Sequence, residues 1–312
     1  MKVIINDFVL QITSKLNHHP GISCFFTAVR DVINFAKKDM EVTDLDVFLA
    51  FNGANIAYKK GEFLGFDFCN PKNFEIIGSN YEVIGRQRIK GIIDKIEPEF
   101  LKRNPVLCCA QTQHLNYHEI YLNNVGRMHM ITAFGINQDE GFCYVYDPHI
   151  RLNADSFARY AGPFAISNLA NAIDHYLIFS SLDKFCVSVQ DYNLGDIIDI
   201  YLRYGHPSIE SYFLDCLEDL SRECDIYQTC ININHDIKLN GPCYILNYLI
   251  LFCGEIGYYQ HIENLELLKL DWLVIANSFL ISGCRKNPLR VRENLIAAVK
   301  KLDQHKSILS IM

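Results

Sequence analysis

The segment around Cys24 constrains the fold more than any other part of the sequence. A Pro20-Gly21 turn comes before it, and apolar residues then recur at helical spacing: Phe25, Ala28, Val29, Val32, Ile33 and Ala36. Gly21 permits a tight turn, and Ser23 suits the N-cap position. A thiol in the first turn faces unpaired N–H groups and the positive end of the helix dipole, which favour the nucleophilic thiolate. The pattern predicts a helix starting at Cys24 and a candidate nucleophile; a buried structural cysteine, one of twelve, is the alternative.

A second pattern predicts a β-hairpin. Residues 127–136 are rich in β-branched and aromatic side chains, residues 137–141 have turn composition, and residues 142–147 form a returning strand that we expect to end at Pro148. Cys108 and Cys109 lie on a further predicted strand that starts near residue 106. These strands indicate a sheet that follows the Cys24 helix in the chain. Residues 165–180 are predicted to form one further helix.

The hairpin register predicts which side chains meet. We take Ile136 as the partner of Phe142. Asp147 then lies opposite Ile131, which shares a face of the sheet with His129 because strand side chains alternate. Asp147 becomes the diagonal neighbour of His129, close enough for a carboxylate to fix the tautomer of an imidazole. A register slip of one residue would put the two on opposite faces.

The order of a cysteine at a helix start, then histidine and aspartate on neighbouring strands, is that of papain-like folds. Local motifs resemble the butirosin biosynthesis protein H family of acyltransferases and also echo bacteriocin-processing peptidases. The motifs are His19-Pro20-Gly21-Ile22-Ser23-Cys24 with Thr27-Ala28-Val29-Arg30, Asn104-Pro105-Val106-Leu107-Cys108-Cys109-Ala110, Leu115-Asn116-Tyr117-His118, the His129 strand and Tyr146-Asp147-Pro148.

The resemblance implies a fold class and an activity. The fold is α+β, a papain-like cysteine-protease fold with an N-terminal helix packed on an antiparallel sheet, followed by a mainly helical domain. The activity is that of an amide-forming acyltransferase, as in closthioamide-type amide synthetases of antibiotic biosynthesis. An acyl group passes from a carrier-protein thioester through acyl-Cys24 to an amine, while His129 moves the proton and Asp147 orients His129.

The resemblance also implies partners and further site residues. Phosphopantetheine is supplied on an acyl or peptidyl carrier protein, a small amine is the acceptor, and no bound cofactor or metal is required. His18 and His19 stand where papain-like enzymes place a glutamine that donates to the oxyanion, and a neutral imidazole can donate one N–H. Asn52, Gly53 and Tyr117 are the implied substrate-binding residues.

Composition supports an intracellular two-domain enzyme. The chain has 312 residues, half of them apolar, enough for a catalytic domain over 1–190 and a helical domain over 191–312 that covers the site. The second domain is predicted to contain helices over 194–204, 208–224, 244–258, 265–282 and 289–302. Asn287 is the expected N-cap of the last helix, with Pro288 at its first position. The net charge of −7 disfavours nucleic acid as a partner. No secretory pattern, membrane-length apolar run, zinc-finger spacing or nucleotide-binding glycine motif is found, so we expect a cytoplasmic location without membrane attachment.

Two other functions remain open at this stage. A papain-like cysteine peptidase or amidase would use the same three residues, with water in place of the amine. An inactive binding module would keep the fold without the chemistry. The sequence does not decide the assembly state, and a homodimer is one alternative.

Overall fold

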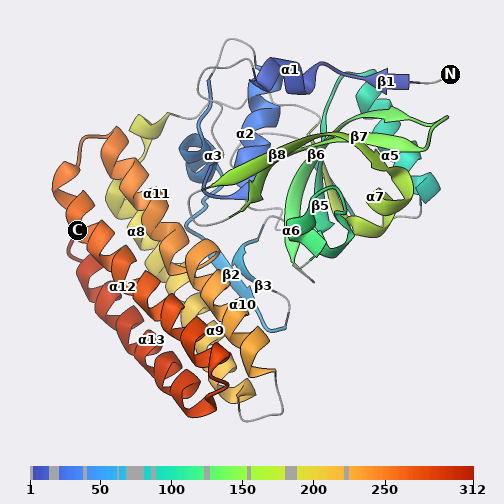
Figure 1. The fold of residues 1–312 in the computed structure, drawn as a ribbon. Helices are drawn as coiled ribbons and strands as arrows, with labels where there is room; N and C mark the ends of the chain where they lie inside the picture. Colours follow the sequence, from blue (N-terminus) through green and yellow to red (C-terminus); the bar gives the residue numbers. More distant parts are fainter. Residues whose placement is uncertain are drawn as a thin grey trace. The chain divides into compact units, whose positions relative to one another are not determined.

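The protein is described by a computed structural model that covers residues 3–13, 21–37, 41–61, 63–67, 81–85, 89–122, 127–152, 156–179, 188–220 and 225–312. It divides into two compact units. Unit 1 comprises Met1–Val47 and Phe74–Cys186, and unit 2 comprises Phe48–Asn73 and Val187–Met312. The architecture is mixed α and β, with an antiparallel sheet in unit 1 and a helical C-terminal region (Figure 1).

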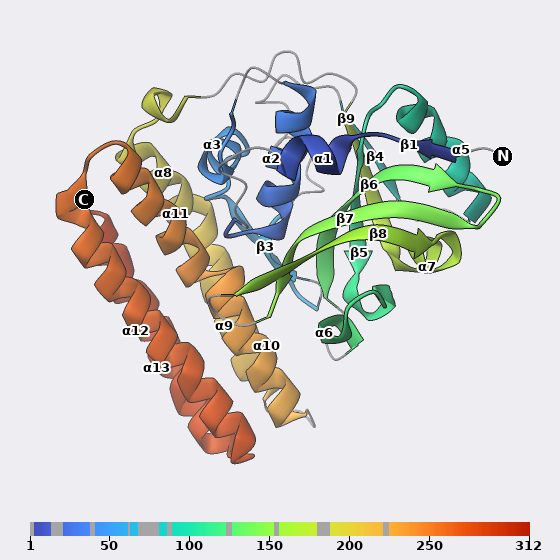
Figure 2. The same cartoon turned by 45° about the horizontal axis from the view of Figure 1, so that its top comes forward.

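Unit 1 is built on a seven-stranded sheet in the order β4-β9-β5-β6-β7-β8, with β1 paired to β6, and every pairing is antiparallel. Figure 2 shows β6, β7 and β8 side by side. The strands are β1 (Val3–Ile5), β4 (Tyr81–Gly85), β5 (Val106–Gln111), β6 (Met128–Asn137), β7 (Phe142–Arg151), β8 (Phe157–Ala165) and β9 (Ile173–Phe179). The helices are α1 (Phe8–Thr13), α2 (Cys24–Ala36), the start of α3 (Asp44–Ala50), α5 (Ile89–Leu101), α6 (Glu119–Leu122) and α7 (Ile166–Ala172), with a 3₁₀ turn at Thr112–His114.

The core of unit 1 forms where α5 and α7 pack on the sheet. Ile131 and Ala133 of β6 and Cys143 and Val145 of β7 share this core with Leu169 of α7. Their period of two within each strand is the pattern of strands with one face against a helical layer. The helix α2 packs against β6 and β7. The expected helix on an antiparallel sheet is therefore present, whereas the papain-like fold stays a prediction.

Two sequence predictions about this unit were wrong. Residues 165–180 were expected to be one helix, but the chain leaves α7 after Ala172 and forms β9, which pairs with both β4 and β5. The second hairpin strand was expected to end at Pro148, but β7 continues to Arg151. A register shift between Asp147 and Ile150 admits the proline, because a bulge does not require the N–H that proline lacks.

Unit 2 consists of helices and one hairpin. Its elements are the end of α3, β2 (Ile56–Lys59), β3 (Phe63–Phe66), a 3₁₀ turn at Val189–Asp191, α8 (Leu194–Ile200), a π-helical segment at Tyr201–Gly205, α9 (His206–Asp219), α10 (Ile226–Leu239), α11 (Pro242–Glu255), α12 (Tyr259–Cys284) and α13 (Pro288–Leu309). Helix α12 packs against α10, α11 and α13. Asn287 caps α13 through the N–H of Arg290, with Pro288 at the first helical position, as the sequence predicted.

Residues 48–61 and 63–67, which the sequence placed in the first domain, belong to unit 2 instead. The Phe48 ring stacks on Tyr248 of α11, with ring centroids 4.0 Å apart. The hydroxyl of Tyr244 donates to the carbonyl of Gly53 over 3.0 Å. These contacts join residues far apart in sequence, so no local pattern indicates them.

Helix α12 is long and apolar enough to cross a membrane when length and composition alone are considered. The core helix of a globular unit meets the same criteria. Leu265, Leu268, Trp272 and Phe279 of α12 are buried, whereas Leu267, Leu270 and Val274 are exposed.

Candidate functional site

Helix α2 starts at Cys24, as predicted, and Ser23 holds the N-cap position with extended backbone angles. The Ser23 carbonyl accepts the N–H of Thr27, which is the first turn of the helix. The Ser23 side chain makes no capping hydrogen bond. Cys24 therefore lies in the first turn, where backbone N–H groups lack helical partners and the dipole favours negative charge.

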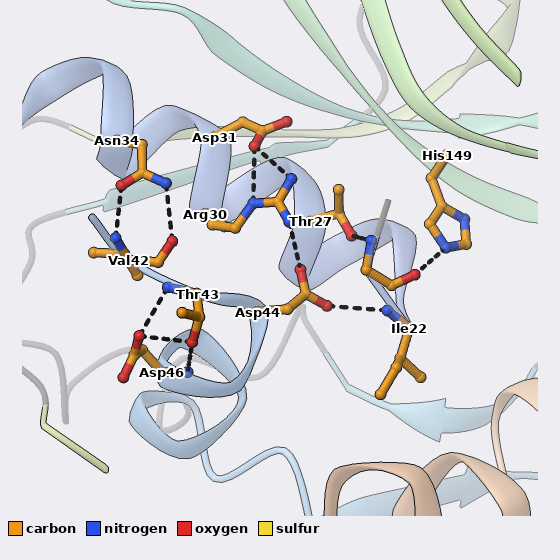
Figure 3. A network of polar contacts seen from close by, with 11 residues as sticks. Ile22, Thr27, Arg30, Asp31, Asn34, Val42, Thr43, Asp44, Asp46 and His149 are labelled. Atoms are coloured by element: carbon orange, nitrogen blue, oxygen red, sulfur yellow. Dashed lines mark hydrogen bonds and ion pairs between the residues drawn. The ribbon is translucent and has the colours of Figure 1, made fainter. Parts of the chain in front are cut away.

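A polar network holds the turn before Cys24 (Figure 3). The N–H of Gly21 donates to Thr27 Oγ1 over 3.0 Å, and the N–H of Ile22 donates to Asp44 Oδ2 over 3.2 Å. The guanidinium of Arg30 lies 3.6 Å from Asp44 Oδ1 and donates to Asp31 Oδ1 over 2.8 Å and 3.0 Å. The turn is thus tied to buried charges on α2 and at the start of α3.

His129 on β6 and Asp147 on β7 meet in this structure. His129 Nε2 lies 2.9 Å from Asp147 Oδ1, and Asp147 is fully buried. Near this contact the strand pairing is Thr132 with Tyr146, which places Asp147 opposite Ile131, as the sequence predicted. At the turn end the prediction was wrong, because Ile136 pairs with Cys143 and not with Phe142. A bulge between Ala133 and Gly135 reconciles the two registers.

Asp147 accepts four hydrogen bonds, two on each oxygen. Oδ1 accepts from His129 Nε2 and, over 3.1 Å, from the backbone N–H of His149. Oδ2 accepts from the hydroxyls of Tyr117 at 2.8 Å and Tyr121 at 2.5 Å. A carboxylate has about four lone-pair sites, so this buried group is fully satisfied in its ionised form.

The electrostatics of the site favour an ion pair between Asp147 and His129. Burial by itself lowers the pKa of His129, but the charges of Asp147 and then Cys24 outweigh it and raise the pKa to about 10. Burial by itself raises the pKa of Asp147, yet His129 and the hydrogen bonds hold it below the usual range. Burial, followed by the charge of Asp147, raises the pKa of Tyr121 far above its ordinary value, so its hydroxyl keeps its proton. Both shifts favour the imidazolium–carboxylate form of the pair over the neutral form.

Cys24 is a further neighbour of the imidazole. Its thiol is within hydrogen-bonding and Coulombic range of His129, and both contacts stabilise the charged imidazole. Nε2 faces Asp147, so Nδ1 is the ring nitrogen left for the sulfur. The three side chains form a Cys–His–Asp row within unit 1. Such a row can exchange one proton between sulfur and imidazole while the carboxylate fixes the ring.

His149 links the row to the turn before Cys24. Its Nε2 lies 2.7 Å from the carbonyl of Gly21 (Figure 3). Burial, and then the positive charge of His129, lowers the pKa of His149 to about 4, so the ring is neutral and donates one N–H to that carbonyl. The same residue donates its backbone N–H to Asp147. One residue of β7 therefore fixes both the carboxylate and the nucleophile turn.

The other predicted site residues have different positions. Tyr117, expected to bind substrate, is half-buried and donates its hydroxyl to Asp147. Asn52 and Gly53 belong to unit 2, where they end α3: Asn52 has a left-handed backbone (φ 51°), and the Gly53 N–H donates to the Phe48 carbonyl. The candidate oxyanion residues His18 and His19 lie outside the described part of the chain.

Tyr121 and His149 were not predicted from the sequence. His149 lies two positions after Asp147, a spacing that keeps strand residues close, and this signal was available. Tyr121 lies on a four-residue helix, and no local pattern points it toward β7. Within the described residues, no group of three or more His, Cys, Asp or Glu side chains is placed to hold a metal ion. Neither a protein-family model nor a curated protein matches this chain.

Proposed function

We propose that the protein is a cysteine-dependent acyltransferase that forms an amide from a carrier-protein thioester and an amine. The observation that carries the proposal is that His129 interacts with both Cys24 and Asp147. The choice of a thioester donor and an amine acceptor rests on the sequence resemblance to the butirosin biosynthesis protein H family.

In the first step the Cys24 thiolate attacks the carbonyl carbon of the thioester. A carbon–sulfur bond forms to Cys24, and the bond to the phosphopantetheine sulfur of the carrier breaks. The leaving thiolate takes the proton from His129, which becomes neutral. The N–H groups at the start of α2 are suited to stabilise the oxyanion that forms on the way.

In the second step an amine attacks acyl-Cys24. A carbon–nitrogen bond forms, the bond to the Cys24 sulfur breaks, and His129 takes the proton that the amine nitrogen loses. The thiolate and the imidazolium are regenerated, so the cycle consumes no co-reactant. Asp147 stays ionised throughout, stabilises the imidazolium of the free enzyme and orients the neutral imidazole of the acyl-enzyme.

Intact-protein mass spectrometry tests this proposal. Incubation with an acyl-carrier protein, or with a small acyl-N-acetylcysteamine thioester, should make the protein heavier by one acyl group. An added amine should then discharge it as amide. Cys24→Ala should stay unmodified, and Cys216→Ala should behave as wild type, because Cys216 lies in the helical unit and burial raises its pKa to about 12.

The alternatives give different results in the same experiment. Rapid release of free acid with amine in excess would identify a hydrolase, which is the peptidase or amidase alternative. A Cys24 that never becomes acylated by any thioester would contradict the proposal and favour the binding module. Acylation of another cysteine while Cys24 stays free would contradict the assignment of the nucleophile.

A further inference from the structure

The contacts of the two tyrosines beside Asp147 differ in one respect. Both hydroxyls donate to Asp147 Oδ2, but only Tyr121 also contacts the imidazole, with its hydroxyl oxygen 2.9 Å from His129 Nε2. The half-buried ring of Tyr117 packs against Tyr121 and Tyr160, with ring centroids 5.7 Å and 4.3 Å away. The chain therefore supplies a matched pair of phenols around one carboxylate.

The proton positions at Tyr121 follow from the charges. The tyrosine proton points at the carboxylate, since Asp147 has no proton to offer. The oxygen lone pairs of Tyr121 remain for the N–H at Nε2 of His129. That N–H is thus shared by two acceptors, Asp147 Oδ1 and Tyr121 Oη, both at 2.9 Å. Two acceptors from two elements fix the plane of the ring more firmly than one.

We propose that Tyr121 is a positioning residue that orients the His129 imidazole, with its hydroxyl bridging Asp147 and Nε2 so that Nδ1 is aimed at Cys24. The inference rests on the proposed function of the Cys24–His129–Asp147 row. It adds a fourth residue, contributed by α6, which the chain places between β5 and β6. Tyr121 touches neither substrate nor acyl group in this role; it acts through His129.

Removal of each hydroxyl has an effect of predictable sign on the imidazolium. Tyr121→Phe takes away a direct acceptor at 2.9 Å, which makes the charged ring less stable. It also frees one site on Asp147, which strengthens the attraction between carboxylate and ring, but this effect is indirect and smaller. Tyr117→Phe has only the indirect effect. The two variants should therefore shift the ion pair in opposite directions.

The alkylation rate of Cys24 as a function of pH measures the ion pair without any acyl substrate. With limiting iodoacetamide and peptide mapping, the pH at which the Cys24 rate is half of its plateau should rise by about one unit in Tyr121→Phe. In Tyr117→Phe it should stay or fall. Tyr160→Phe is the matched control, because that hydroxyl donates to the carbonyl of Pro163 and should leave the profile unchanged.

Turnover supplies the second measurement. Tyr121→Phe should lower kcat about tenfold with KM nearly unchanged, while the melting temperature stays close to that of Tyr117→Phe. Equal alkylation profiles for Tyr121→Phe and Tyr117→Phe would overturn the inference. A shifted profile in a protein that never accepts an acyl group would uphold the role of Tyr121 and refute the proposed acyl transfer, so the two failures are distinguishable.

Discussion

Substitution of Gly21 by alanine should destabilise unit 1 because of one close contact. A Cβ at this position would lie 2.0 Å from Asp44 Oδ2, 2.2 Å from Cγ and 2.3 Å from Oδ1. Real Cβ atoms essentially never approach closer than 3.0 Å, so the carboxylate must withdraw. Asp44 would then lose its bond from the Ile22 N–H and weaken its contact with Arg30.

The size of the effect follows from those lost contacts. A hydrogen bond to a charged group contributes about 1.5–3 kcal/mol, and overpacking costs about 1–3 kcal/mol, of which relaxation recovers part. We expect Gly21→Ala to lower the free energy of unfolding by about 3 kcal/mol, and the melting temperature by about 6–12 °C. The alkylation rate of Cys24 should fall as well, because the turn that presents it shifts.

A double-mutant cycle provides the test. In an Asp44→Ala background the clash is gone, so Gly21→Ala should cost less than about 1 kcal/mol. In an Asp44→Asn background the side chain keeps its size, and the cost should persist. Urea denaturation of the five proteins and the wild type measures these differences. Equal costs in the alanine and asparagine backgrounds would refute the steric reasoning.

Two further predictions concern buried groups in each unit. Burial outweighs the effect of Arg30 and raises the pKa of Asp31 to about 6, above 3.8 in the unfolded chain. The folded state then binds this proton more tightly, so Asp31 makes stability fall by about 3 kcal/mol as pH rises from about 4 to 6. In Asp31→Asn, the free energy of unfolding measured by urea denaturation should lack this fall with pH. If wild type and Asp31→Asn lost stability in parallel over the same pH range, the result would contradict the prediction. In unit 2, a Cβ on Gly53 would lie 2.2 Å from the Phe48 ring, so Gly53→Ala should cost about 2–3 kcal/mol. Gly254→Ala, with open space around it, should be neutral or stabilising by thermal denaturation, and equal losses would show that the Phe48 contact is not the cause.

The sequence predicted the parts of the site that depend on local patterns. The start of α2 at Cys24 follows from the Pro-Gly turn and helical periodicity, and the strands β6 and β7 follow from composition and a turn. What it missed depends on tertiary context. The short apolar run at residues 176–179 is compatible with a strand as well as with a helix, so the prediction of a helix over β9 was wrong. Helix α10 is rich in Ile, Asn and Thr, which have modest helix propensity, and it was not predicted.

Tyr121 shows a different limit of sequence reasoning. Its hydroxyl reaches Asp147 across 26 positions of sequence and His129 across 8. Both contacts exist because α6 places Tyr121 next to the start of β6. That position depends on tertiary structure and not on a local pattern. A phenol that contacts both His129 and Asp147 therefore has no signature in residue spacing, whereas a cysteine at the start of a helix does.

The register of β6 and β7 is the most instructive case. The predicted pair of Ile136 with Phe142 was wrong, yet it led to the observed contact between His129 and Asp147. The residue pairs sum to 279 near the turn, as for Ile136 with Cys143, and to 278 beyond the bulge, as for Thr132 with Tyr146. Phe134 is the extra residue on β6. Without it, the turn-end register would continue, and Asp147 would lie opposite Thr132 on the other face.

The signal for that bulge is present in the sequence at Gly135. A Cβ there would lie 2.7 Å from the carbonyl of Ile4 on β1, so the strand needs a glycine where β1 pairs with it. Glycine inside a strand pattern indicates a bulge or a close backbone approach, and here it marks both. The core-facing residues Ile131, Ala133 and Ile136 indicate the same bulge, because the spacing between them changes from two to three residues across it. A register that is extended from the turn to His129 and Asp147 must therefore include the bulge. The interrupted alternation of core-facing residues in β6 is the local pattern that indicates the position of this bulge.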